Sequence, residues 1–194
     1  MIVTLSEMKA ELGLSDTTDD ALLTQAMAAL DGRFDSFLNR ILARGINVIE
    51  YFDGGGRTLL LARFPVESVT SIHVDADAVW GAETLLGSTD YRLNKLRGRI
   101  VFGADGSESW PTGYQNIRVV YTAGFVAGGE IPPAGQSAMP EAIRRAYILQ
   151  CAFEWRNRTH LGQQSVSAQG GSINLAPAKL LPEVQDILNE WKRY

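Results

Sequence analysis

Cysteine, histidine and long apolar runs are scarce or missing in this 194-residue chain, and each absence excludes a class of protein. A single cysteine, Cys151, excludes an internal disulfide framework. Two histidines, His73 and His160, leave few side chains for a zinc or transition-metal site. No apolar run approaches the roughly 20 residues that a membrane helix needs. We therefore expect no metal, no cofactor and no membrane contact.

A strong positive charge is also missing. The chain has 18 basic and 22 acidic residues, a net charge of −4. Strongly basic nucleic-acid-binding domains usually have a pI above about 9, so a tight nucleic-acid clamp is excluded while a small basic patch is not. The first residues lack the basic start and apolar stretch of a signal peptide, which predicts a cytoplasmic origin.

What is present divides the chain into three parts. Residues 1–46 have apolar positions at helical spacing, and residues 47–131 hold short β-branched runs between glycines and aspartates. Residues 132–194 are helical again. The sequence therefore predicts an α+β fold in which helices precede and follow a β-rich part.

Helix boundaries follow from capping signals. Thr4 and Glu7 have the spacing of a capping box, and Gly13 is expected to end this short first helix. A longer helix is expected to begin in residues 15–20 and to end at Gly45, along a stripe formed by Leu23, Met27, Leu30, Phe34, Phe37 and Ile41.

Prolines mark the later helices. Pro140 is expected to open a helix that runs to about Arg158, because its missing N–H costs nothing in a first turn. Pro182 is expected to start a last helix that includes Trp191 on its apolar side. Residues 159–178, between these helices, are expected to form a long flexible loop.

The β-rich part is clearest at its turns. Residues 48–52 and 58–61 are β-rich and flank Asp53-Gly54-Gly55-Gly56, which predicts a hairpin. A second hairpin is expected about residues 94–98. With further strands at residues 69–74 and 117–122, about six strands suffice for a small sandwich or open barrel.

No motif indicates catalysis. The Asp53 turn lacks the lysine and the following helix of a phosphate loop. Asp75 and Asp77 lack the later glycine and glutamate of a calcium loop. The histidines have no catalytic partner at a recognisable spacing, and Cys151 fits a small core residue. Adjacent carboxylates fit capping and turns better than acid–base work. We expect no catalytic, cofactor-binding or metal-binding residues.

Three features instead suggest contact with a partner. Residues 159–178 carry no charge, and a segment with scattered apolar residues (Val166, Ile173 and Leu175) is suited to ordering on a partner or adding a strand to a neighbour's sheet. The chain ends in Trp191-Lys192-Arg193-Tyr194, residue types that are frequent at interface hot spots. One helix carries four arginines, Arg144, Arg145, Arg156 and Arg158.

Each feature has a plainer interpretation. The uncharged segment fits a linker, the C-terminal residues fit packing against their own domain, and the arginines fit a solvated helix face. The contact residues expected on this basis are Val166, Ile173, Leu175, Trp191, Arg193, Tyr194, Arg156 and Arg158.

The whole pattern resembles the head–tail connector proteins (adaptor or head-completion proteins) of tailed bacteriophages, prophages and gene-transfer particles. The resemblance covers the chain almost end to end and rests on the order and spacing of residues 3–9 (VTLSEMK), 19–23 (DDALL), 50–56 (EYFDGGG), 64–72 (FPVESVTSI), 98–100 (GRI), 120–125 (VYTAGF), 140–146 (PEAIRRA) and 155–158 (WRNR). The end differs, because Trp191-Lys192-Arg193-Tyr194 stands where a Pro-Tyr-Arg-like finish is expected.

The resemblance implies a function that composition does not. Such proteins form a ring of twelve subunits beneath the portal protein. The ring extends the DNA channel and docks a stopper or tail-terminator protein. It implies a helical connector domain from residues 1–46 and 132–194, and a peripheral β subdomain from residues 47–131. It also implies a non-enzymatic protein of the virion neck, present in the host cytoplasm during assembly, through whose ring DNA only passes.

Two other functions are compatible with the residues. A β-sandwich binding module for a glycan or peptide would use exposed aromatic residues such as Trp80, Trp110 and Tyr114. A hydrolase would need two carboxylates about 5–10 Å apart in a cleft, which no local pattern suggests.

Overall fold

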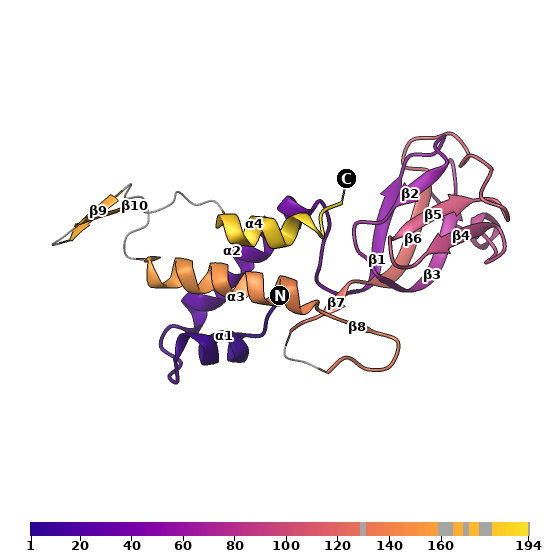
Figure 1. The fold of residues 1–194 in the computed structure, drawn as a ribbon. Helices are drawn as coiled ribbons and strands as arrows, with labels where there is room; N and C mark the ends of the chain where they lie inside the picture. The colour runs from indigo at the N-terminus through magenta and orange to yellow at the C-terminus, as the bar shows by residue number, and fades with distance from the viewer. Residues whose placement is uncertain (129–130, 159–164, 169–170, 175–179, 194) are drawn as a thin grey trace. The chain divides into compact units, whose positions relative to one another are not determined.

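The computed structural model describes residues 1–128, 131–158, 165–168, 171–174 and 180–193. The chain divides into two compact units (Figure 1). The helical unit comprises Met1–Asn39, Ala127–Glu130 and Met139–Tyr194. The β unit comprises Arg40–Val126 and Ile131–Ala138. The α+β fold class expected from the sequence is confirmed.

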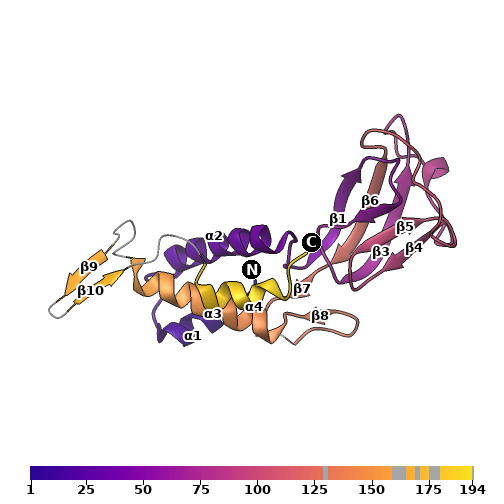
Figure 2. The ribbon, with the colours of Figure 1, turned by 45° about the horizontal axis from the view of Figure 1, so that its top comes forward.

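The helical unit is organised around one central helix. Its helices are α1 (Leu5–Leu12), α2 (Asp20–Leu38), α3 (Glu141–Arg156) and α4 (Pro182–Asn189). α3 packs against each of the other three. Figure 1 shows it between α1 and α4, and in Figure 2 α2 lies above α3 and α4. The core is formed by buried side chains from all four helices, including Met8, Leu23, Met27, Leu30, Phe34, Ile143, Tyr147, Val184 and Leu188.

The capping signals of the first helix are confirmed, while the end of the second was predicted too late. The Thr4 hydroxyl accepts a hydrogen bond from the Glu7 N–H at 3.2 Å, and Gly13 ends α1 with φ of 70°. α2 ends at Leu38 rather than near Gly45. Asn39 adopts the left-handed conformation with φ of 53°, which asparagine tolerates better than most residues, and so terminates the helix.

The two C-terminal helices lie close to their predicted positions. α3 ends two residues before the predicted Arg158. α4 begins at Pro182 as expected but ends at Asn189, so Trp191 lies beyond it. The Trp191 N–H bonds to the Leu188 carbonyl, three residues back, which closes a tighter turn than an α-helix allows.

The β unit contains two three-stranded antiparallel sheets. The first has the order β1-β6-β3, with β1 at Gly45–Phe52, β6 at Ile117–Ala123 and β3 at Val66–Val74. The second has the order β2-β5-β4, with β2 at Thr58–Leu60, β5 at Arg99–Phe102 and β4 at Tyr91–Asn94. One core cluster is shared by both sheets and includes Leu59, Leu61, Val66, Ile72, Ile100, Trp110, Ile117, Val119 and Tyr121.

Short elements complete the β unit. A 3-10 turn, η1, covers Ala82–Thr84, and β7 (Phe125–Val126) pairs in parallel with β8 (Ser137–Ala138). The expected hairpin about residues 94–98 is confirmed as the antiparallel β4–β5 pair.

The hairpin predicted at the glycine-rich turn is wrong. β1 and β2 belong to different sheets, because β1 pairs with β6 and β2 pairs with β5. The turn is held by another loop instead: Gly54 N–H bonds to the Gly113 carbonyl, and Gly55 N–H bonds to the Trp110 carbonyl, both at 2.9 Å. A Cβ atom on Gly54 would lie 1.7 Å from the Pro111 oxygen, so this close approach requires glycine.

Candidate contact site on the helical unit

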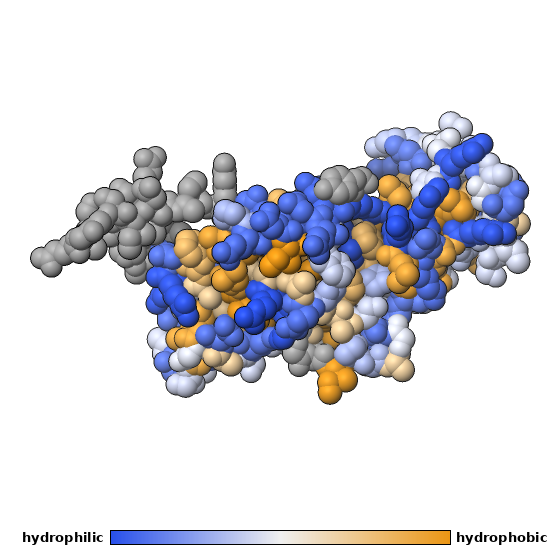
Figure 3. Space-filling model, viewed as in Figure 1, coloured by the Kyte–Doolittle hydropathy of each residue, from blue (hydrophilic) through white to orange (hydrophobic). Residues whose placement is uncertain are grey.

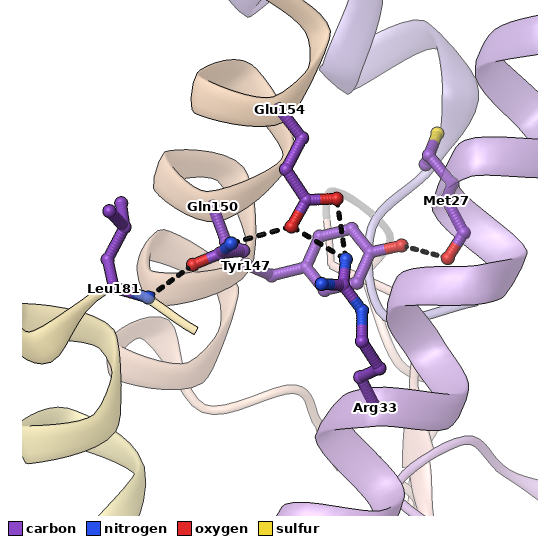
Figure 4. Close-up of polar contacts among 6 residues, drawn as sticks. All are labelled: Met27, Arg33, Tyr147, Gln150, Glu154 and Leu181. Carbon is purple, nitrogen blue, oxygen red and sulfur yellow. Dashed lines mark hydrogen bonds and ion pairs between the residues drawn. The ribbon is translucent and has the colours of Figure 1, made fainter. Parts of the chain in front are cut away.

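A buried amide on α3 fixes the start of α4. The Gln150 side chain is fully buried, and its Oε1 accepts a hydrogen bond from the Leu181 N–H at 2.8 Å (Figure 4). Its Nε2 donates to Glu154 Oε1, one helical turn further on, at 2.6 Å. Leu181 directly precedes α4, whose first backbone N–H groups have no partner within the helix. Gln150 therefore anchors the point at which the chain returns to the helical unit.

The same carboxylate ties α2 to α3. Arg33 Nη2 donates to both oxygens of Glu154, at 2.6 and 2.5 Å. Nearby, the buried Tyr147 hydroxyl donates to the Met27 carbonyl at 2.7 Å, and burial raises the pKa of this phenol. A charge-assisted pair and two hydrogen-bonded buried groups thus hold three helices together.

Chemically, this network is suited to holding helices rather than to catalysis. Cys151 is adjacent and is 2% exposed. Burial, together with the negative charge of Glu154, raises the pKa of its thiol to about 11. The thiol is therefore protonated at neutral pH, the opposite of what a nucleophilic cysteine requires. This agrees with the interpretation of Cys151 as a core residue.

The network lies at the base of the uncharged segment. The chain leaves the described part of the helical unit at Arg158 and returns at Leu180. Between them, β9 (Ser165–Ala168) pairs antiparallel with β10 (Gly171–Asn174), and Val166 is the register partner of Ile173. An isolated two-stranded ribbon is only marginally stable in water, so this one is suited to pairing or packing with something else. Leu175 lies outside the described residues.

The four arginines do not form one group. Arg144, near the start of α3, makes ion pairs with Glu7 and Glu141. Arg156 is exposed at the last position of α3. Arg158 folds back on the helix end, where its Nη1 donates to the Trp155 carbonyl at 3.0 Å and its guanidinium lies 4.3 Å from the centre of the Trp155 ring.

The C-terminal residues pack on their own unit. The Arg193 N–H donates to the Leu38 carbonyl at 3.0 Å, and Asn39 Nδ2 donates to the Arg193 carbonyl at 3.2 Å. Lys192 lies over the Phe37 ring at 5.0 Å. Trp191 is half-buried, and Tyr194 lies outside the described residues. The backbone of this terminus is therefore already engaged with the end of α2.

A mixed-charge hollow lies among α1, α3 and α4. Its volume is about 430 Å³, and its charged lining residues are Glu7, Glu11, Glu141, Glu183, Arg144 and Arg145. Ile148 and Leu149 add an apolar part, and Figure 3 shows apolar side chains over α3 bordered by hydrophilic ones. Neither a histidine nor a cysteine lines this hollow.

The aromatic residues of the alternative binding module do not form an exposed set. Trp110 is 1% exposed and packs on Phe102 in the core, so it is unable to stack on a ligand. Trp80 is half-buried against Tyr51, with ring centres 5.7 Å apart, and Tyr114 is exposed. Aromatic residues of this kind equally fit packing, and Trp110 packs in the core cluster shared by both sheets.

The described residues contain one histidine, His73, and it belongs to no metal-ligating cluster. His73 is buried on β3 with its Nδ1 3.3 Å from the Thr84 hydroxyl, whereas His160 lies outside the described residues. In the described part of the chain, no cluster of three or more metal-ligating side chains occurs. None of the described helices is long and apolar enough to cross a membrane.

The buried network is the part that sequence reasoning missed. Gln150 and Glu154 stand four residues apart on α3, and a glutamine within a helical stripe of apolar residues is the available signal. Their partners, Arg33 and Leu181, are 121 and 31 residues away in the sequence. No local spacing predicts those contacts.

The fold defines an α+β class in which segments from both ends of the chain build a helical unit and the middle builds a β unit. Comparison with known proteins then identifies the family. Residues 1–194 match the model of the head completion proteins, and the chain belongs to this family.

Solved structures share the fold. A chain from the neck of an empty GTA particle, computed with C6 symmetry, aligns with a TM-score of 0.62 and 18% identity, covering 100% of this chain and 90% of that one. A chain from the neck of a native GTA particle, computed with C12 symmetry, aligns with a TM-score of 0.54, 20% identity and the same coverage. No curated protein matches the chain in sequence.

Proposed function

We propose that the chain is a structural, non-enzymatic adaptor of a phage-like virion neck. It forms a homo-oligomeric ring, a dodecamer in the particle, beneath the portal protein. The ring extends the DNA channel, through which DNA only passes, and docks a stopper or tail-terminator protein. The observation that carries this proposal is the head completion family match over residues 1–194, joined with a fold match to neck proteins over the whole chain.

Charge supports a channel rather than a DNA-binding role. Tight DNA binding depends on neutralising phosphates with lysine and arginine, and a ring through which DNA slides must avoid it. The chain has a net charge of −4. On the helical unit, several basic side chains already face carboxylates, including Lys9 with Asp20 and Arg33 with Glu154.

The contact site that we assign is the segment between α3 and α4, with Val166 and Ile173 on its ribbon and Arg156 and Arg158 at its base. The portal or a neighbouring subunit is its partner. Support comes from Gln150, whose hydrogen bond to the Leu181 N–H fixes where the chain rejoins the unit. The C-terminal residues, Trp191 to Tyr194, are a weaker part of this assignment because their backbone is engaged with α2.

Electron microscopy tests the adaptor role directly. The chain is mixed with portal rings encoded in the same genome neighbourhood. We expect an added ring of density stacked on the portal, whose symmetry gives the copy number. Bare portal rings, with the chain folded and in excess, would contradict the proposal.

Three variants test the contact site, and two of them are a matched pair at Arg156. In the first variant, residues 161–178 are replaced by a Gly/Ser linker of equal length. α4 is retained, because Val184 and Leu188 belong to the core of the helical unit. We expect unchanged helix content but bare portal rings. The second variant, Arg156→Glu, is compared with Arg156→Lys, and only the charge reversal should weaken docking. Normal docking by the linker variant would refute the assignment.

A further inference from the structure

The outer face of the β2-β5-β4 sheet concentrates positive charge on an acidic protein. Between residues 91 and 101 the sequence reads YRLNKLRGRIV, with four basic residues and no acidic one. Arg92, Lys95, Arg97 and Arg99 are all exposed. Because the whole chain has a net charge of −4, this cluster is a local reversal of sign.

Strand register decides which side chains share this face. Leu59, Ile100 and Leu93 are register partners and pack in the core cluster. Side chains alternate along a strand, so the flanking residues point to the other face. These outer residues are Thr58, Leu60, Val101, Arg99, Arg92 and Asn94. We call this surface, together with Lys95, Leu96 and Arg97 of the β4–β5 turn, the basic sheet face.

Three of the basic side chains on this face contact neutral oxygens. Arg99 Nη2 lies 3.3 Å from the Thr58 hydroxyl oxygen, Lys95 Nζ donates to the Glu67 carbonyl at 3.0 Å, and Arg92 Nε donates to the Ala104 carbonyl. Within the described residues, none of the ion pairs involves Arg92, Lys95 or Arg99. Arg92, Lys95 and Arg99 are therefore held in place by neutral oxygens, and their positive charges are not used in ion pairs among the described residues.

Nearby acids do not cancel the cluster. The Glu67 carboxylate is paired with Arg44 at 2.8 Å. At the opposite end of the sheet, hydrogen bonds from Ser107 lower the pKa of Asp105, with a smaller contribution from the charge of Arg92. At the end that carries the β4–β5 turn, Lys95 and Arg99 therefore take part in none of the ion pairs found among the described residues.

Apolar side chains lie among the charges. Leu60 is 51% exposed and Leu96 is 79% exposed. Phosphate binding needs cations and makes no use of exposed leucines, whereas protein interfaces combine apolar contacts with arginine. Complementary charge steers such an encounter and selects the partner. The mixture therefore favours a protein surface over nucleic acid.

We propose that the basic sheet face docks an acidic surface of another neck protein, one that offers carboxylates around an apolar contact. The proposal rests on the proposed function, because it assigns a partner surface to the adaptor. It concerns the β unit and is separate from the contact site on the helical unit.

The test uses the full chain in cells that produce the particle. Arg92 and Arg99 are exposed, so the double variant Arg92→Glu/Arg99→Glu is expected to fold, which an unchanged melting temperature verifies. We expect at least a 100-fold drop in tailed particles counted by electron microscopy. The charge-conserving control, Arg92→Lys/Arg99→Lys, should stay within about threefold of the natural chain. Suppressors of the Glu variant should replace an acidic residue of another neck protein by lysine or arginine.

Three outcomes would overturn the proposal. Tailed particles at the natural level in the Glu variant would show that the face docks nothing. Loss in the Lys control as well would show that charge is not the determinant. Binding of a 20-base-pair DNA duplex by the natural chain, lost in a Glu variant that still attaches tails, would assign the face to phosphates. Tailed particles in cells lacking the chain altogether would instead overturn the proposed function.

Discussion

Replacing Gln150 by leucine tests whether the buried network fixes α4. The substitution keeps the size of the side chain and removes both of its hydrogen bonds, to the Leu181 N–H and to Glu154. A neutral hydrogen bond contributes about 1 kcal/mol, one to a charged group about 1.5–3 kcal/mol, and a buried N–H left unpaired costs more. Only the bond to the Leu181 N–H reaches α4, because Glu154 lies on α3 itself, so we expect a loss of about 1–2 kcal/mol in the local stability of α4.

Hydrogen exchange resolved by peptide measures this loss. A change of about 1–2 kcal/mol corresponds to a roughly 10-fold faster exchange of α4 amides. β6 lies in the other unit and serves as an internal control, because its exchange should not change. Leu149→Gln, at the neighbouring exposed position, is the matched control and should shift α4 exchange less than twofold.

A second substitution separates the two bonds. In Gln150→Glu, the new side chain keeps an oxygen that accepts the Leu181 N–H but loses the amide N–H that donates to Glu154. We therefore expect α4 to exchange closer to the natural rate in Gln150→Glu than in Gln150→Leu at pH 7. Unchanged α4 exchange in Gln150→Leu would refute the assigned role of the network.

Three further predictions concern single sites. Burial raises the pKa of Cys151 from 9.0 to about 11, so the folded helical unit should lose stability as the pH rises from 9 to 11, and Cys151→Ala should flatten this part of the pH profile. Gly54→Ala should cost about 2–3 kcal/mol in urea unfolding of the β unit, because its Cβ would overlap the Pro111 carbonyl oxygen. Trp110→Ala should cost about 3–5 kcal/mol in the same assay, and a cost below 1 kcal/mol would show that Trp110 is not a core residue.

Local signals in the sequence were sufficient for most elements. The capping of α1 depends on Thr4, Glu7 and Gly13, which are all within one short segment. The β4–β5 hairpin depends on a four-residue turn, residues 95–98, between two strands that pair with each other. In both cases the residues that determine the structure are neighbours in the chain, so their pattern carries the information.

The failures share a different cause. The glycine-rich turn reads as a hairpin, yet its backbone bonds go to Gly113 and Trp110, more than fifty residues away. α2 ends because Asn39 adopts a left-handed conformation. The residues that follow Asn39 contain no signal that predicts this conformation. The hydrogen bond between Gln150 and Leu181 likewise joins α3 to the start of α4, which the whole uncharged segment separates in the sequence. Which strands pair, and which distant residues form contacts, depends on the whole folded structure and is not encoded in a local pattern.

The hydrogen bond between Gln150 and Leu181 affects which parts of this fold can vary in sequence. The Gln150–Leu181 bond holds α4 against α3 at the base of the segment. The packing of the helical core therefore does not depend on which residues stand between these two helices. Doubling the length of such a loop costs only about 0.6 kcal/mol in closure entropy. Changes in the length or sequence of this segment should therefore leave the core of the helical unit unaltered.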